Sequence, residues 1–243
     1  MDARSAINTT SNRLINFLSL DDRAILAPHM ERVSLVPRQN LEEPNQPIAQ
    51  IYFPEDGVVS VVGSSNGMGQ HEVGIIGKEG MTGLMVVLGN SQSPLHTFVQ
   101  IAGSGLVMSS AHLRKVMAHS PSIRDVFLMY VQVYLVQTSQ TAIANAAAVL
   151  PQRLARWLLM CEDRLTSKHI PLTHEFLSIM LGVQRSGVTI AMGDLEDRGL
   201  IRGDRGVVHI LDRKTLIKLT DGSYGLAEAQ YEHLFSPRTE SHH

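Results

Sequence analysis

The chain has 243 residues, 44% hydrophobic and 18% charged, with one cysteine and a net charge of −2. This length fits two domains or one large domain, and the composition is too apolar for a disordered chain. A single cysteine excludes an internal disulfide and a cluster held by several thiolates of one chain. No apolar run has the length of a membrane span, so we expect a cytoplasmic protein without a membrane partner.

Positive charge is concentrated in one segment. Residues 1–150 contain 9 Lys and Arg against 11 Asp and Glu, residues 151–218 contain 11 against 8, and residues 219–243 contain 1 against 4. Nucleic-acid binding needs basic side chains on one face, so only residues 151–218 suit it. Their excess is small, and the placement of individual arginines must therefore matter more than bulk charge.

The first predicted element is a short helical segment from Asn12 to Met30. Residues 33–110 then show short β-rich runs separated by Gly, Pro and Asn, a pattern typical of an all-β sandwich or roll. The runs are VSLV, IAQIYF, VVSVV, HEVGII, TFVQIA and GLVMS. Residues 54–57 and 64–69 are predicted to form hairpin loops, because Gly and Asn adopt positive φ angles easily.

A long helix is predicted from Ser122 to about Ala148, where no Gly or Pro occurs. Its apolar residues recur at helical spacing, which leaves one face for the β-rich domain and another apolar face. That second face is either buried within the chain or forms a seam between two chains. We favour a homodimer. The residues predicted to form the seam are Phe127, Tyr130, Val133 and Tyr134.

Pro151 marks the start of a second domain, because proline is tolerated in the first turn of a helix but not in its interior. The next helix is predicted from Gln152 to Leu165, with its apolar side chains inward and three arginines outward. These arginines are Arg153, Arg156 and Arg164.

The segment from Thr173 to Gly199 has the spacing of two helices that cross at a tight turn. Thr173 suits the N-cap of the first helix, and Gly182 suits the turn. The second helix would start at Gln184, end before Gly199 and enter the DNA major groove, as in a helix-turn-helix. The predicted base-contacting residues on its outer face are Arg185, Ser186, Thr189 and Ile190.

Arg185 is the strongest candidate for a base contact, since arginine can pair with both guanine acceptors at once. Residues near the helix starts suit phosphate contacts. They are Thr173, His174 and Gln184. An alternating hairpin follows around residues 203–206, so the motif is a winged helix, and Arg202 and Arg205 are candidates for contacts with the DNA backbone. The alternatives are a purely structural helix pair and solvated surface arginines.

The chain resembles the Crp/Fnr superfamily of bacterial transcription regulators over nearly its whole length. The resemblance is most specific in LEDRGLI at 195–201, with IYFPEDG at 51–57 and GKEGMTG at 77–83. It implies an α+β chain with a jelly-roll-like β-roll sensor domain (1–120), a dimerisation helix and hinge (121–150), a winged helix (151–220) and a C-terminal tail (221–243). It also implies a homodimer on an inverted repeat of double-stranded DNA, with RNA polymerase as a partner if the protein is an activator.

The resemblance also implies an effector pocket in the β-roll. Its candidate residues are Met81, Thr82, Gly83, Leu95, His96, Thr138 and Ser139. Relatives that bind cyclic AMP have a Gly-Glu-Leu turn and an arginine on the cyclic phosphate, and neither is found here, which disfavours a cyclic nucleotide. Thr138 and Ser139, where relatives place adenine contacts, favour one. Haem, bound by some relatives, has only weak support. The histidines in or near the roll are His71, His96, His112 and His119.

Two other functions compete with DNA binding. A ligand-binding signalling module could act through protein partners, although the outward arginine and complete winged-helix spacing weigh against it. An enzyme is not expected, because the chain has no metal-ligand spacing, nucleophile elbow or phosphate-binding loop. We therefore predict no catalytic residue, no metal site and no obligatory cofactor.

Overall fold

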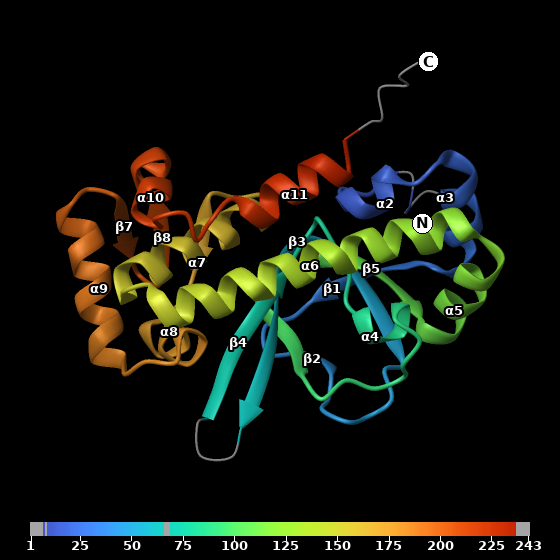
Figure 1. The fold of residues 1–243 in the computed structure, drawn as a ribbon, viewed down its shortest axis with the longest axis horizontal. Helices are drawn as coiled ribbons and strands as arrows, with labels where there is room; N and C mark the ends of the chain where they lie inside the picture. The colour runs from blue at the N-terminus through green and yellow to red at the C-terminus, as the bar shows by residue number, and fades with distance from the viewer. Residues whose placement is uncertain (1–6, 8, 66–68, 237–243) are drawn as a thin grey trace.

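The computed structural model describes residues 7, 9–65 and 69–236, and it combines a β-roll, a long helix and a helical C-terminal domain (Figure 1). The first elements are α2 (Arg13–Phe17), α3 (Leu20–Leu26) and the 3-10 helix η1 (Ala27–His29). The predicted single helical segment is therefore interrupted. Ser19 causes the break, because its side chain accepts a hydrogen bond from Asp22 N and starts a new helix at Leu20.

The β-roll is an antiparallel sheet with the strand order β1-β5-β3-β4, and β2 also pairs with β5. The strands are β1 (Glu31–Leu35), β2 (Asn40–Glu42), β3 (Gln50–Ser65), β4 (Gly69–Ile76) and β5 (His96–Ser109). Four of the predicted β-rich runs are joined in pairs, two within β3 and two within β5. The predicted strand content is confirmed, but the strands are longer than the runs.

The prediction of a hairpin loop at residues 54–57 is wrong. Strand β3 continues through this stretch, and its pairing with β5 shifts register around Asp56 and Val58. Gly57 has a φ of 94°, so the turn residues form bulges that bend a continuous strand. The second predicted loop lies between β3 and β4, where Ser65 pairs with Gly69, and its residues 66–68 are outside the described part of the chain.

Helix α6 (Pro121–Ala147) runs along the β-roll as far as the C-terminal domain (Figure 1). It begins at the N-cap Ser120, whose side chain accepts from Ile123 N, and it ends at Ala148, which has extended backbone angles. The shorter helices α4 (Leu84–Val87) and α5 (Ser110–His119) precede α6 in the chain. The main core joins α2, α3, β3, β5, α5 and α6.

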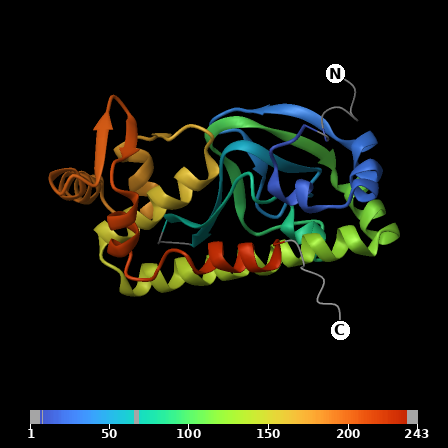
Figure 2. The same ribbon diagram turned by 90° about the horizontal axis from the view of Figure 1, so that it is seen from above.

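The C-terminal domain contains helices and one three-stranded sheet of order β6-β8-β7. Its elements are α7 (Leu150–Arg164), β6 (His169–Pro171), α8 (His174–Leu181), α9 (Arg185–Asp197), β7 (Ile201–Asp204), β8 (Val207–Ile210), α10 (Arg213–Leu219) and α11 (Leu226–Leu234). Residues 226–234 were expected in a tail. They form α11, which returns to lie alongside α6 (Figure 2).

The C-terminal domain and the β-roll share a hydrophobic core. Val58, Ile75 and Ile101 of the roll pack in the same cluster as α7, α8 and α9. Within the described residues no single helix is long and apolar enough to cross a membrane, and only α8 with α9, bent by 105°, reaches that composition as a pair. The same part of the chain holds no group of three or more His, Cys, Asp or Glu side chains that could bind a metal ion.

Candidate nucleic-acid interface

Helices α8 and α9 form the predicted helix-turn-helix. Their axes differ in direction by 105°, within the range of about 90–120° typical of the motif. Thr173 caps α8, with its side chain accepting from Phe176 N at 3.2 Å. Gly182 ends α8 with a φ of 61°, a left-handed conformation that favours glycine. The N-cap of α9 is Gln184, and Gly199 follows its end with a φ of 66°.

Helix α9 has one buried face and one exposed face. The buried face holds Val188, Ala191, Met192 and Leu195, each at most 4% exposed. The four residues predicted to contact bases are all on the exposed side. They are Arg185, Ser186, Thr189 and Ile190, of which Ile190 is 74% exposed. An apolar side chain with this exposure on a surface helix suits contact with a thymine methyl group.

A groove of about 520 Å³ between α9 and the β7–β8 wing brings together five of the nine predicted DNA contacts. They are Thr173, His174, Arg185, Thr189 and Arg205. His174 Nδ1 lies 3.0 Å from the Thr189 hydroxyl, so the start of α8 is linked to the second turn of α9. The other four residues, which do not line the groove, are Gln184, Ser186, Ile190 and Arg202, all exposed.

The wing is held against α9 by a carboxylate. Glu196 Oε1 accepts a hydrogen bond from Gly203 N at 2.7 Å. At the tip, Arg205 and Gly206 both have positive φ angles, which is typical of a two-residue hairpin turn. The side chain of Arg205 is 96% exposed and 4.0 Å from Asp204, so it is free to reach a phosphate beside the groove.

The prediction of the dimerisation seam needs correction. Phe127, Tyr130, Val133 and Tyr134 are at most 7% exposed and pack within one chain. They are therefore unavailable to a second chain. Helical spacing identified the apolar face of α6, and the β-roll and α11 of the same chain cover that face. The large apolar side chains of α6 that remain exposed are Leu128, Leu135 and Ile143.

The prediction that three arginines of α7 point outward is also wrong for two of them. Arg156 is 8% exposed and Arg164 is 4% exposed, whereas Arg153 is half-buried. Arg156 Nε donates to Ser223 O at 2.8 Å, and Arg164 forms a 2.8 Å ion pair with Glu79. The roll and the segment before α11 cover these arginines from different sides, so α7 lacks the fully solvated face that its sequence suggests.

Three of the candidate effector residues are buried at the start of α4. Met81 and Thr82 are fully buried, and Thr82 Oγ1 accepts a hydrogen bond from Tyr52 N. The backbone N–H of Gly83 donates to Glu42 Oε1 at 2.6 Å. The carboxyl group of Glu42 thus occupies a backbone donor that an anionic ligand would need, and burial raises its pKa. An incoming phosphate would have to displace it.

The other four candidate effector residues have partners of their own or lie in contact with solvent. His96 Nε2 is 3.0 Å from Asn40 Oδ1, and Leu95 is partly buried. Thr138 and Ser139 both donate to Leu135 O of their own helix, at 2.9 and 2.8 Å. These two hydroxyl groups are therefore committed to α6, and Ser139 lies on its exposed side.

A buried polar cluster between the roll and the C-terminal domain was not found from the sequence. Glu72 of β4 accepts hydrogen bonds from Trp157 Nε1 at 2.9 Å and from Ser60 Oγ at 2.5 Å. Burial raises the pKa of Glu72 to about 7, partly offset by these hydrogen bonds and by Arg156. The available signal was one acidic residue in the β-rich run HEVGII. The Trp157 partner was beyond the reach of local patterns.

Residues 152–219, which contain α8, α9 and the wing, match the family model of the Crp-like helix-turn-helix domain. No curated protein matches the chain. Among solved structures, a protein from Eubacterium rectale described as a Crp/Fnr family transcriptional regulator is 16% identical, with a TM-score of 0.65 over 86% of this chain and 97% of that chain.

Two other solved structures have the same fold. FixK2 from Bradyrhizobium japonicum is 16% identical, with a TM-score of 0.65 over 78% of this chain and 96% of that chain. CLP, a c-di-GMP-responsive regulator from Xanthomonas campestris, is 16% identical, with a TM-score of 0.64 over 80% of this chain and 100% of that chain. Residues 152–219 are therefore a Crp-like helix-turn-helix domain, and the chain has the fold of the Crp/Fnr superfamily, as its sequence resemblance predicts.

Proposed function

We propose that the protein is a sequence-specific DNA-binding transcription regulator. The observation that carries this proposal is the division of α9 into a buried face and an exposed face that begins with Arg185. A recognition helix needs this division, because its inner side must hold it on the domain while its N-terminal outer side contacts base edges. In this proposal residues 151–220 form the DNA-binding domain, residues 1–120 the sensor domain, and residues 121–150 the dimerisation helix and hinge.

Dimerisation is proposed to use the exposed face of α6 in place of the buried one. Six exposed residues follow one another there at alternating steps of four and three residues, which is the spacing of a coiled-coil seam. They are Leu128, Gln132, Leu135, Ser139, Ala142 and Ala146. The leucines would supply the apolar contact, and the small residues would let two α6 helices approach closely. The pair would place two α9 helices on an inverted repeat about one duplex turn apart.

The β-roll is proposed to respond to a ligand that places no phosphate at Gly83. Its backbone N–H already donates to the buried carboxyl group of Glu42. A cyclic phosphate at Gly83 would lie against the carboxyl group of Glu42. None of the effector residues predicted from the sequence is an arginine that could pair with the phosphate, so burying its charge there would cost free energy. The c-di-GMP response stated for CLP is a property of that protein and does not identify the ligand of this one.

The test is selection of bound duplexes from a random pool, with wild type, Arg185→Ala and Arg198→Ala compared. Arg198 follows the opposite end of α9 and pairs with Asp194 at 3.3 Å, so its removal is the matched control. We expect wild type and Arg198→Ala to select the same inverted repeat, and Arg185→Ala to lose preference at one base pair per half-site, at a cost of about 1–3 kcal/mol.

The salt dependence of binding separates DNA recognition from a role in protein contacts alone. Affinity for the selected site should fall steeply between about 50 and 200 mM salt, because phosphate contacts release counterions. Absence of any enrichment, both for the protein alone and with small molecules extracted from cells, would contradict the proposal. Equal selection by wild type and Arg185→Ala would show that α9 does not read the bases.

A further inference from the structure

The carboxyl group of Glu72 is buried where the β-roll meets the C-terminal domain. Two side chains of the C-terminal domain cover it. Trp157 of α7 donates to Glu72 Oε1 at 2.9 Å, and the sulfur of Met180 in α8 lies 3.8 Å from Ser60 Oγ, beside the carboxyl group. Strand β4, which carries Glu72, is at the edge of the sheet and next to α8 (Figure 1). Moving the C-terminal domain away from the roll would therefore bring water to this carboxyl group.

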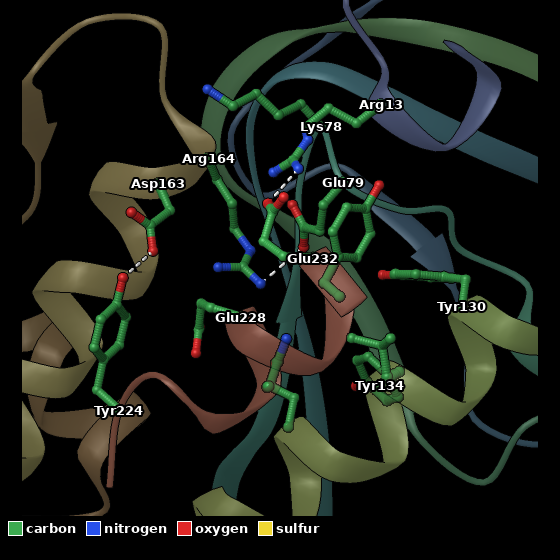
Figure 3. Close-up of a pocket in the computed structure, with 14 residues that line it drawn as sticks. Arg13, Lys78, Glu79, Tyr130, Tyr134, Asp163, Arg164, Tyr224, Glu228 and Glu232 are labelled. Carbon is green, nitrogen blue, oxygen red and sulfur yellow. Dashed lines mark hydrogen bonds and ion pairs between the residues drawn. The ribbon is translucent and has the colours of Figure 1, made fainter. Parts of the chain in front are cut away.

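The cationic side chains around Glu72 have their own partners. Arg156 of α7 donates to backbone oxygens, and Arg164 of α7 forms a 2.8 Å ion pair with Glu79 on the wall of a cavity between α6, α7 and α11 (Figure 3). Both arginines favour the charged form of Glu72 only through space. A carboxylate here would therefore be buried without an ion-pair partner, which is costly. The other titratable groups around it are Arg153 and Cys161 of α7, Tyr134 of α6 and His71, the preceding residue of β4.

The hydrogen bonds around Glu72 also fit a neutral carboxyl group. Glu72 Oε2 lies 2.5 Å from Ser60 Oγ, which also contacts Oε1 of the buried Gln100 in β5. The hydroxyl group of Ser60 has one hydrogen, so with this orientation of the Gln100 amide it donates to only one of the two oxygens. If Glu72 holds a proton, it donates to Ser60, and Ser60 donates to Gln100. If Glu72 is ionised, Ser60 must donate to it, and the oxygen of Gln100 loses its donor at a cost in free energy.

We propose that one proton controls the contact between the β-roll and the C-terminal domain. The contact is closed while Glu72 is neutral, and ionisation of Glu72 shifts it toward an open form in which the folded C-terminal domain has left the roll. The apolar contacts of Val58, Ile75 and Ile101 with the C-terminal domain do not depend on pH, and the proton adds to them. Since α8 takes part in the contact, the proton on Glu72 determines how the helix-turn-helix is held on the roll.

The direction of the pH effect follows from the two pKa values of Glu72. Burial raises the pKa to about 7 in the closed form, and the ordinary value of 4.5 applies once water reaches the group. The closed form therefore binds the proton more tightly, and the ratio of closed to open form falls up to tenfold per pH unit between these values. Above about pH 7 the ratio no longer changes, because Glu72 is then ionised in both forms. Between pH 5 and 8 the ratio falls about 50- to 100-fold in total.

The test follows the indole N–H of Trp157, the only tryptophan of the chain, by NMR hydrogen exchange in the full chain. This group is buried against Glu72 in the closed form, so it exchanges only when the contact opens. Rates at pH 5, 6, 7 and 8 are corrected with those of a free tryptophan derivative. We expect the protection factor to fall about 50- to 100-fold from pH 5 to pH 8. It should also be at least about tenfold below that of the slowest amides of β5, which report global unfolding.

Glu72→Gln should make the protection factor of the indole N–H independent of pH. The matched control is Glu42→Gln, which removes a buried carboxyl group that accepts from Gly83 N within the roll, and it should keep the wild-type pH dependence. The proposal is overturned if the wild-type protection factor does not fall with pH, or if it falls equally in Glu72→Gln. It is also overturned if the indole N–H exchanges as slowly as the slowest β5 amides, because the opening is then global unfolding. No DNA is present, so these outcomes do not depend on the proposed function.

Discussion

Replacing Glu72 by Gln tests whether the buried carboxyl group between the roll and the C-terminal domain is protonated in the folded protein. Both carboxyl oxygens are occupied, Oε1 by Trp157 Nε1 and Oε2 by Ser60 Oγ. A glutamine amide has the same shape, and its oxygen can accept from Trp157 while its NH₂ group donates to Ser60. The substitution therefore removes the titration and keeps the hydrogen bonds.

The size of the effect follows from the pKa of Glu72. It is 4.5 in an unperturbed glutamate, and burial raises it to about 7 here. Between these values only the folded chain holds the proton, so the free energy of unfolding falls as the pH rises, by about 1.4 kcal/mol per pH unit. Over the whole window this is about 3 kcal/mol. Below pH 4.5 Glu72 is protonated in both states, and its titration then costs no stability.

The assay is urea denaturation followed by circular dichroism at several pH values from 5 to 8. Glu72→Gln should exceed wild type by about 3 kcal/mol at pH 8, and the difference should shrink to less than about 1 kcal/mol at pH 5. Glu31→Gln, which removes an exposed carboxyl group from β1, controls for the loss of one negative charge.

A lower stability of Glu72→Gln at pH 8 would refute this reasoning. It would mean that Glu72 is ionised in the folded protein and that Arg156, which contributes favourably to its charge, compensates fully for burial. If the difference in unfolding free energy between wild type and Glu72→Gln did not depend on pH, the raised pKa of Glu72 would be refuted, because the titration of Glu72 is what makes that difference depend on pH.

Gly182→Ala should cost about 1–2 kcal/mol of stability in thermal unfolding, because the φ of Gly182 is 61° and the new Cβ would lie 2.3 Å from His71 Nδ1. The control is Gly193→Ala in α9, where nothing lies within 4 Å of the new Cβ, and it should stabilise the protein by up to about 1 kcal/mol. A smaller cost for Gly182→Ala than for Gly193→Ala would contradict this account. Arg164→Met should cost about 3–5 kcal/mol in urea denaturation, since it leaves the Glu79 carboxylate unpaired, and a neutral result would show that this ion pair is not buried in solution. Leu135→Glu should shift the protein from dimer to monomer in sedimentation velocity and change the unfolding free energy of the monomer by less than about 0.5 kcal/mol; an unchanged dimer would remove the proposed α6 seam.

Much of the candidate interface was predictable because its signals are local. The Thr173 cap, the Gly182 turn and the stop before Gly199 each act within one or two helical turns. The 3.6-residue period then places Val188 and Ile190 on opposite faces of α9. The same rules failed at residues 54–57, since a glycine with positive φ suits a bulge within a strand as well as a loop.

The sequence by itself determined the elements and the helix-turn-helix, because caps, turn residues and hydrophobic periods act over a few residues. Only the tertiary structure decided which element of the chain packs against each face of α6 and α7. It buried Tyr130 of the predicted seam and Arg164 of the predicted outer face, and it returned α11 to α6 to close a cavity. The physical reason is that burial depends on packing between segments that are distant in the sequence. A hydrophobic period identifies an apolar face of a helix, but it does not identify the segment that covers this face.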